Sequence, residues 1–301
     1  MSDSLPDSGG RSPSTAGSDG VPWAMELQPR YGATPVLRFD PPPTDPAVPM
    51  LRQRRRLADT LAGLDQAQWA APSRCAGWAC RDVVSHLVTV NAFWAVSIAA
   101  GRAGEPTRYL ARFDPVATPP QLVAAAPDTT DAELLAAYRA STESLAAAVD
   151  GLDADGWARP AEAPPGHVSI AAVVLHALWD GWVHERDIVV PLGLEPVEEP
   201  DEVAGTLRYA VGIGPAFLAT TGSTRTGAFA VRGTGPAVDL VVEVGPDVVV
   251  RNGPAPGVVP TVAGGAVELA ECFSLRTSPP VLPGDDGWMV GGLAVLFDQA
   301  G

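Results

Sequence analysis

Apolar residues recur at helical spacing along four long stretches in the first two thirds of the chain. The pattern predicts amphipathic helices over residues 47–64, 81–101 and 130–149, the last opened by a Thr-x-x-Glu capping box. A fourth stretch, residues 168–190, is apolar on most sides and is stopped by Pro191. Four long helices joined by loops predict a helix bundle.

The pattern changes after about residue 200. A further helix is expected over residues 202–219, and beyond it polar and apolar residues alternate in three short runs bounded by turns. These three strands, and two short helices after them, are expected over residues 227–232, 237–244, 247–251, 264–275 and 286–299. The predicted fold class is therefore α+β: a four-helix bundle followed by a small α+β domain with an antiparallel sheet.

A short pattern, Leu-Asp-x-x-x-Trp-Ala-x-Pro, occurs twice, at residues 64–72 and 152–160. Each copy follows a predicted helix and precedes a long apolar helix that carries histidine. This spacing is typical of two helix-loop-helix halves packed against each other. In such a pair the second and fourth helices can face each other, so that His86 would meet Asp180 and His184.

Ionisable residues recur every four positions on the fourth predicted helix, at His176, Asp180 and His184. Positions four apart advance by only about 40° around a helix, so the three side chains share one ridge. A buried helix must pair such groups or give them a metal. With His86 they would supply two imidazoles and one carboxylate with an open coordination position, a pattern typical of catalytic zinc that also suits nickel or iron.

Composition excludes several classes of function. A formal charge of -15 and a pI near 4.5 argue against nucleic acid or an anionic membrane as a partner, and the basic run at residues 52–56 is interpreted as a solvated helix face. Residues 83–100 include His86 and Asn91, so no membrane span is predicted. The first residues lack the apolar core of a signal peptide, and three cysteines indicate a reduced, cytoplasmic protein, with Cys75 as a small buried residue.

The same observations divide the chain. Residues 1–46 are rich in Pro, Gly, Ser and Asp without periodicity and are predicted to form a disordered arm. Residues 47–200 are expected to form the metal-binding bundle, and residues 201–301 the linker helix and the small α+β domain.

Two segments carry a resemblance to a known family. They are Gly77-Trp-Ala-Cys-Arg-Asp-Val-Val-Ser-His86 and Trp179-Asp-Gly-Trp-Val-His-Glu-Arg-Asp187. They resemble the mycothiol-dependent maleylpyruvate isomerase family, whose N-terminal domain is a DinB-like metal-binding bundle. The resemblance covers roughly residues 47–300, because the last segment is similar to that family's small sterol-carrier-like C-terminal domain.

The resemblance implies a divalent metal, usually zinc, held by His86, Asp180 and His184. Aspartate stands at position 180 where the family usually has glutamate. The resemblance also implies a functional arginine in the C-terminal domain, for which Arg276 is the nearest match, although Leu275 replaces the glycine that precedes it in the family. Mycothiol would be the thiol cosubstrate.

His176 has no place in that three-ligand set. It is a candidate fourth ligand, a proton shuttle or a partner that orients Asp180, and the last role is favoured. The sequence Glu185-Arg186-Asp187 is interpreted as a self-paired ionic patch, with a substrate-binding role for Arg186 as the alternative.

The implied chemistry is addition of the thiol of mycothiol to a small unsaturated or electrophilic metabolite, giving isomerisation or thiol transfer. No residue has the setting of a built-in nucleophile, so the thiol or a water must come from outside. The alternatives are a metal-dependent hydrolase or lyase that uses bound water, with His176 as base, and a non-catalytic protein that binds a small ligand. The expected assembly is a monomer or homodimer.

Overall fold

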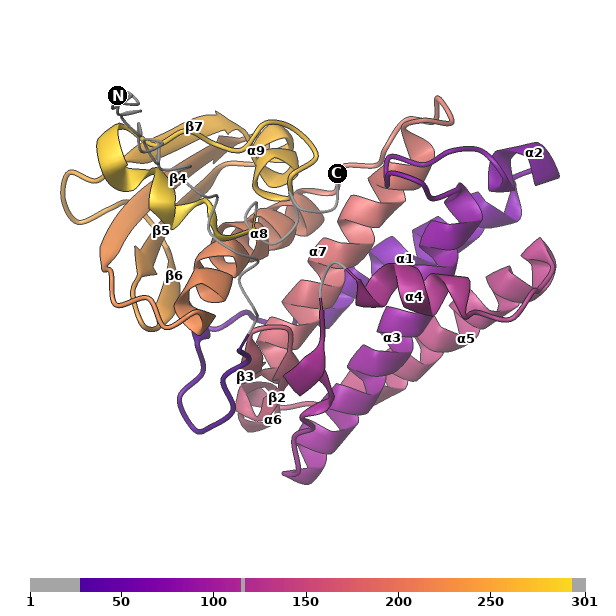
Figure 1. The fold of residues 1–301 in the computed structure, drawn as a ribbon, viewed down its shortest axis with the longest axis horizontal. Helices are drawn as coiled ribbons and strands as arrows, with labels where there is room; N and C mark the ends of the chain where they lie inside the picture. The colour runs from indigo at the N-terminus through magenta and orange to yellow at the C-terminus, as the bar shows by residue number, and fades with distance from the viewer. Residues whose placement is uncertain (1–27, 115–116, 294–301) are drawn as a thin grey trace, which may run out of the picture.

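The computed structural model describes residues 28–114 and 117–293. Long helices form a bundle on one side of the molecule (Figure 1). They are α1 (Ala47–Ala62), α3 (Cys80–Ala103), α5 (Asp131–Val149) and α7 (Ile170–Val189). Each coincides with a helix predicted from apolar spacing, and the capping box that opens α5 forms between Thr130 and Glu133.

Shorter elements connect these helices. They are α2 (Gln66–Trp69), η1 (Tyr109–Arg112), α4 (Thr118–Ala124), α6 (Ala154–Ala158), β2 (Pro160–Ala163) and β3 (Gly166–Ser169). The two copies of the repeated pattern form the equivalent short helices α2 and α6, and each is N-capped by the aspartate of its copy. Asp65 accepts from the Gln68 amide at 2.9 Å, and Asp153 accepts from the Gly156 amide at 2.8 Å.

The rest of the chain forms an α+β layer beside the bundle. Its elements are β1 (Leu37–Asp40), α8 (Pro200–Thr220), β4 (Gly227–Thr234), β5 (Val238–Val244), β6 (Val248–Asn252), β7 (Thr261–Gly265), α9 (Ala266–Phe273) and η2 (Gly284–Met289). The strand order is β1-β6-β5-β4-β7. The three predicted strands, β4 to β6, pair antiparallel, whereas β1 and β7 join the two edges in parallel, so the sheet is mixed. The predicted α+β class is confirmed.

Strand β1 corrects one expectation. Residues 37–40 pair with β6, in register from Leu37 opposite Val248, so the prediction of a disordered arm is wrong for this part of it. The reason is an alternation of buried and exposed residues that is too short to stand out, with Leu37 and Phe39 directed inward. Residues 1–27 of the arm lie outside the described residues. Strand β1 lies in the arm yet belongs to the sheet of the C-terminal part. The predicted division of the chain into residues 1–46, 47–200 and 201–301 stays a prediction.

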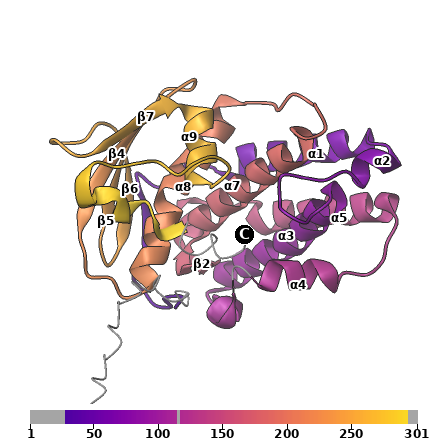
Figure 2. The same ribbon diagram turned by 45° about the horizontal axis from the view of Figure 1, so that its top comes forward.

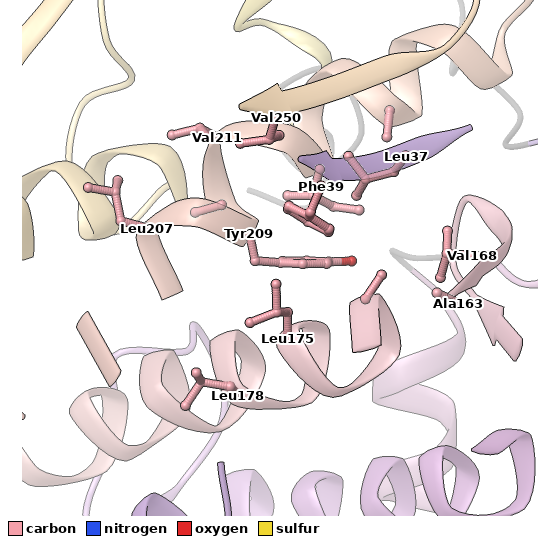
Figure 3. Close-up of a cluster of buried hydrophobic side chains, with 14 of the residues drawn as sticks. Leu37, Phe39, Ala163, Val168, Leu175, Leu178, Leu207, Tyr209, Val211 and Val250 are labelled. Atoms are coloured by element: carbon pink, nitrogen blue, oxygen red, sulfur yellow. The ribbon is translucent and has the colours of Figure 1, made fainter. Parts of the chain in front are cut away.

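Helix α8 lies between the sheet and α7 and joins the two parts into one core (Figures 1 and 2). Figure 3 shows the Tyr209 ring of α8 between Phe39 of β1 and Leu175 of α7. All three side chains are less than a tenth exposed. Apolar contacts therefore continue from the bundle into the sheet, which fixes the C-terminal elements against α7.

Helix α7 is buried on almost every side, since α1 and α3 cover one face and α8 covers another. The buried polar groups of α7 must therefore find their hydrogen-bond and ion-pair partners on the neighbouring helices. Arg54 is fully buried and donates to Asn91 Oδ1 and to the Ala177 carbonyl, both at 2.8 Å. Arg56 pairs with Glu185 of α7 at 2.8 Å. The interpretation of residues 52–56 as a solvated face is wrong, because α1 packs this face against α7 and α8.

Among the described helices, α3 is long and apolar enough to cross a membrane by length and composition alone. In the fold it contacts α5 and α7 and carries His86 into the interior of the bundle. Its apolar character is thereby explained as that of a bundle helix.

Candidate metal centre

His86, Asp180 and His184 converge between α3 and α7, as the spacing of the sequence predicts. The Asp180 Oδ1 atom lies 3.8 Å from His86 Nε2 and 3.6 Å from His184 Nε2. The two imidazole centroids are 5.0 Å apart. Two features bring them together: the four-residue spacing on α7 and the packing of α3 across it. We refer to these three residues as the trio.

The trio fits a divalent metal. Its donor atoms all lie within 4.8 Å of one another. Ligands bonded at about 2.0 Å in a tetrahedral site are roughly 3.3 Å apart, close to the separations seen here. Asp180 Oδ2 is buried and has no hydrogen-bond partner in the described structure, a costly state that a cation would relieve. Two imidazoles and one carboxylate leave coordination positions for a further ligand.

Electrostatics of the trio follow from its neighbours. Burial by itself lowers the pKa of His184, but hydrogen bonds to Asp187 and Cys75 and the charge of Asp180 outweigh it and raise the pKa to about 10. Burial would raise the pKa of Asp180, yet the imidazoles of His86, His184 and His176 beside it hold that pKa well below its usual range. In the metal-free protein His184 is thus an imidazolium, and a metal that binds it displaces a proton.

Asp187 lies next to the trio and is completely buried. Its Oδ2 accepts from His184 Nδ1 at 2.9 Å and from Cys75 Sγ at 3.2 Å. Arg276 donates to both carboxylate oxygens, from Nε at 2.8 Å and from Nη2 at 2.7 Å. Arg276, the arginine predicted in the C-terminal part, therefore contacts Asp187, which in turn contacts His184 of the trio.

Cys75 and Asp187 were not among the site residues expected from sequence. The spacing of three between His184 and Asp187 on one helix was a usable signal, because such residues are neighbours on its surface. Cys75 lies in the loop between α2 and α3 and is half-buried, with Sγ 3.7 Å from His184 Nδ1. No periodicity places a loop residue against a helix more than a hundred residues away.

Leu275 explains how the chain turns Arg276 toward the site. Its φ of 58° is in the left-handed region, which non-glycine residues seldom adopt. The family glycine expected here thus corresponds to a position whose backbone conformation favours glycine. The catalytic role of Arg276 stays a prediction, but its placement beside the trio agrees with it.

His176 occupies a different environment from the trio. Its Nδ1 is 2.6 Å from the Tyr209 hydroxyl, and its ring packs edge-on against Trp94 and Trp179. Burial lowers its pKa to about 4, a shift that the charge of Asp180 only partly opposes. His176 is therefore a neutral, buried residue at pH 7. Among the described residues, His176 belongs to no cluster whose side chains could hold a metal ion together. Its catalytic role stays a prediction.

The expectation that Glu185, Arg186 and Asp187 pair with one another is wrong, because each side chain bonds to a different neighbouring segment. Arg186 donates to Glu271 Oε1 of α9 at 2.7 Å and to Glu198 Oε1 at 3.1 Å, and it lies over the Trp182 ring. Glu185 pairs instead with α1. The guanidinium of Arg186 thus joins α7 to α9, and its role in substrate binding stays a prediction.

A cleft of about 800 Å³ lies away from the trio, near the start of α7. Residues of β1, α5, α6 and the loop after β1 line it, together with Ser169 and Ala171. Asp180 and His184 lie in the second half of α7 and His86 lies on α3, and none of the three lines this cleft. This cleft is therefore not assigned as the substrate pocket of the candidate metal centre.

The fold and the trio define a class of protein: a helix bundle with a buried site of two histidines and one carboxylate, attached to an α+β part that supplies a neighbouring arginine. Residues 50–189 match the family described as the mycothiol maleylpyruvate isomerase N-terminal domain. The match covers most of the helical part of this chain, which is similar to that family.

Two solved structures are similar over most of the chain. One is the mycothiol-dependent maleylpyruvate isomerase, at 16% identity and a TM-score of 0.54, and the other is a mutant of it, at 15% identity and a TM-score of 0.55. Both comparisons cover 78% of this chain and 89% of the other. The likeness extends the shared fold beyond the bundle into the α+β part. No curated protein sequence matches the chain at a significant level.

Proposed function

We propose that the protein is a metal-dependent isomerase or thiol transferase that uses mycothiol and acts on a small unsaturated or electrophilic metabolite. The observation that carries this proposal is the convergence of His86, Asp180 and His184 in a domain of the maleylpyruvate isomerase family. Zinc is the proposed metal, and the same donors suit nickel or iron. The protein acts in the cytoplasm, as a monomer or homodimer, with no nucleic acid or membrane partner.

A divalent metal in the trio would supply Lewis acidity, which favours the deprotonated form of a thiol at neutral pH. The chain provides the setting for this chemistry. The Trp78 ring packs against that of His86, with 5.4 Å between the ring centroids. The side chains of the trio are each less than 15% exposed, which strengthens every electrostatic interaction among them.

An external thiol is still required although Cys75 is close. Its sulfur lies at Nδ1 of His184, whereas the nitrogen directed at Asp180 is Nε2, on the other side of the ring. Cys75 therefore does not face the space where a ligand of the metal would react. Its hydrogen bond to Asp187 gives it a structural role in this proposal.

The environment of His176 weighs against the hydrolase or lyase alternative. That reaction needs a general base beside the metal whose pKa is near the working pH. His176, the candidate base, is bonded to Tyr209 and has a pKa of about 4, so it is a weak base at pH 7. The thiol-dependent reaction asks for no such base and agrees better with the site.

Elemental analysis of the purified protein tests the metal site. We expect about one metal per chain, and loss of that metal in the variants His86→Ala and His184→Ala. His167→Ala is the matched control, because His167 lies in β3 and bonds the Thr107 carbonyl away from the trio. Full metal occupancy in both trio variants would contradict the three-ligand assignment.

Titration of mycothiol into the metal-loaded protein tests the thiol. We expect saturable binding by calorimetry to the wild type and none to His86→Ala. If the loaded wild type takes no thiol, the hydrolase or lyase alternative replaces the thiol-dependent one. If the wild type contains no metal, the trio is an internal polar network and the enzyme proposal fails.

A further inference from the structure

Asp187 is the point where three separate segments meet beside the trio. Its carboxylate is fully buried and contacts His184 on α7, Cys75 in the loop before α3 and Arg276 after α9. Its backbone carbonyl also accepts from the Arg74 amide at 3.0 Å. A buried carboxylate with this many donors is held in one orientation.

That orientation decides which nitrogen of His184 is free for a metal. Asp187 Oδ2 accepts the proton on Nδ1 at 2.9 Å, so Nε2 is directed at Asp180. A histidine that ligates a metal commonly donates its other ring N–H to a carboxylate, which fixes both the tautomer and the direction of the ring. Asp187 occupies that position with respect to His184.

Arg276 holds Asp187 rather than projecting into open space. Its Nε and Nη2 donate to the two carboxylate oxygens, and its Nη1 donates to the Ser274 carbonyl at 3.2 Å. All three guanidinium nitrogens thus have partners within the protein. A bidentate pair of this kind fixes the plane of the carboxylate as well as its position.

We propose that Asp187 is a positioning residue that presents His184 Nε2 to the metal, and that Arg276 is a positioning residue that holds Asp187. The inference rests on the proposed metal site and deepens it. It assigns the C-terminal α+β part a task at the metal centre: the segment after α9 fixes the geometry of a histidine on α7. Arg276 in this arrangement acts through Asp187 and does not touch the substrate.

The test compares Zn²⁺ affinity, measured by competition with a chromophoric chelator, among the wild type, Asp187→Asn and Arg276→Gln. Loss of a carboxylate that orients a ligand histidine typically weakens metal binding about 10–100-fold, and we expect this for Asp187→Asn. Arg276→Gln should show a smaller loss in the same direction. Glu185→Gln is the matched control, because Glu185 is a buried, ion-paired acid on the same helix that does not contact the trio.

We expect Glu185→Gln to keep the wild-type affinity even if it unfolds at a lower temperature. Asp187→Asn that binds Zn²⁺ within about twofold of the wild type overturns the proposal, and unchanged binding by Arg276→Gln overturns the role given to that residue. A wild type that binds no Zn²⁺ overturns the proposed function itself, together with the inference that rests on it.

A second measurement needs no variant. In the Zn²⁺-loaded wild type, long-range ¹H–¹⁵N spectra of the imidazoles should show His184 with Nδ1 protonated and Nε2 on the metal. The four histidines of the chain make this spectrum simple to assign. Metal on Nδ1 of His184 would overturn the proposal whatever the affinities of the variants.

Discussion

His176 should make the folded protein lose stability as the pH falls below neutral. Its imidazole is 6% exposed and packs against Trp94, Trp179 and Tyr209, so burial lowers the pKa from 6.5 to about 4. Of the nearby charges, Asp180 opposes this shift, whereas Arg54 and His86 add to it. Between these two pKa values, His176 is protonated in the unfolded chain and neutral in the folded protein.

The sign and size follow from this difference. Between pH 6.5 and 4 the unfolded state binds more protons, so the free energy of unfolding decreases as the pH falls. At about 1.4 kcal/mol per pH unit for one proton, His176 alone removes about 2 kcal/mol between pH 6.5 and 5. Above pH 6.5 both states are neutral at this residue and it contributes no pH dependence.

Replacement by glutamine removes the titration while keeping a hydrogen-bond partner for the Tyr209 hydroxyl. We expect urea unfolding of His176→Gln, in the same metal state as the wild type, to lose about 2 kcal/mol less stability between pH 7 and pH 5. An NMR titration of the wild type should place the midpoint of His176 near pH 4. Equal pH dependence of the two proteins, or a midpoint above pH 6, would refute this reasoning.

Two further pairs of variants test the packing around α7 and α3. A Cβ at Gly101 would lie 2.5 Å from the Pro160 carbonyl oxygen, so Gly101→Ala should destabilise the fold by about 1–3 kcal/mol. Gly63→Ala is the control, because a Cβ there has its nearest neighbour at 3.5 Å and should not destabilise the fold. Arg54→Met leaves two buried acceptors unpaired and should cost about 3 kcal/mol, whereas the exposed neighbour Arg55→Met should change stability by less than about 0.5 kcal/mol. Urea unfolding followed by circular dichroism measures all four, and equal effects within either pair would contradict the packing described here.

Helix α7 concentrates the chemistry of this protein because it is common to both parts of the fold. Its second half faces α3 through Asp180 and His184, and it faces the segment after α9 through Asp187. A helix buried on nearly all sides can carry such groups only where each finds a partner. Among the described residues of α7, two buried side-chain atoms have no hydrogen-bond partner, Trp182 Nε1 and Asp180 Oδ2, and the second coincides with the site where a metal is proposed.

The likeness to the maleylpyruvate isomerase structures concerns the fold. Aspartate at position 180 makes one proposed ligand a methylene shorter than the glutamate that the resemblance to the family implies. The distances within the trio nevertheless remain compatible with three ligands of one ion. The proposed zinc analysis is therefore the first experiment on which the other proposals depend.

The sequence by itself determined the local structure and half of the candidate metal centre. Apolar periodicity located every long helix of the bundle, because a helix that buries one side must repeat its apolar residues with the helical period. The spacing of four put Asp180 and His184 on one ridge, since the geometry of a helix alone sets the direction of side chains one turn apart. The duplicated Leu-Asp-x-x-x-Trp pattern indicated that a second histidine helix would face that ridge.

Only the tertiary structure decided which distant residues complete the site. His176 and His184 differ by about 80° around α7, enough for His176 to turn to Tyr209 while His184 meets His86. Cys75 and Arg276 reach Asp187 from loops, and β1 joins the sheet from the N-terminal side. These contacts connect segments far apart in the chain. They depend on how whole elements pack, and a local pattern of apolar and polar residues carries no information about that packing.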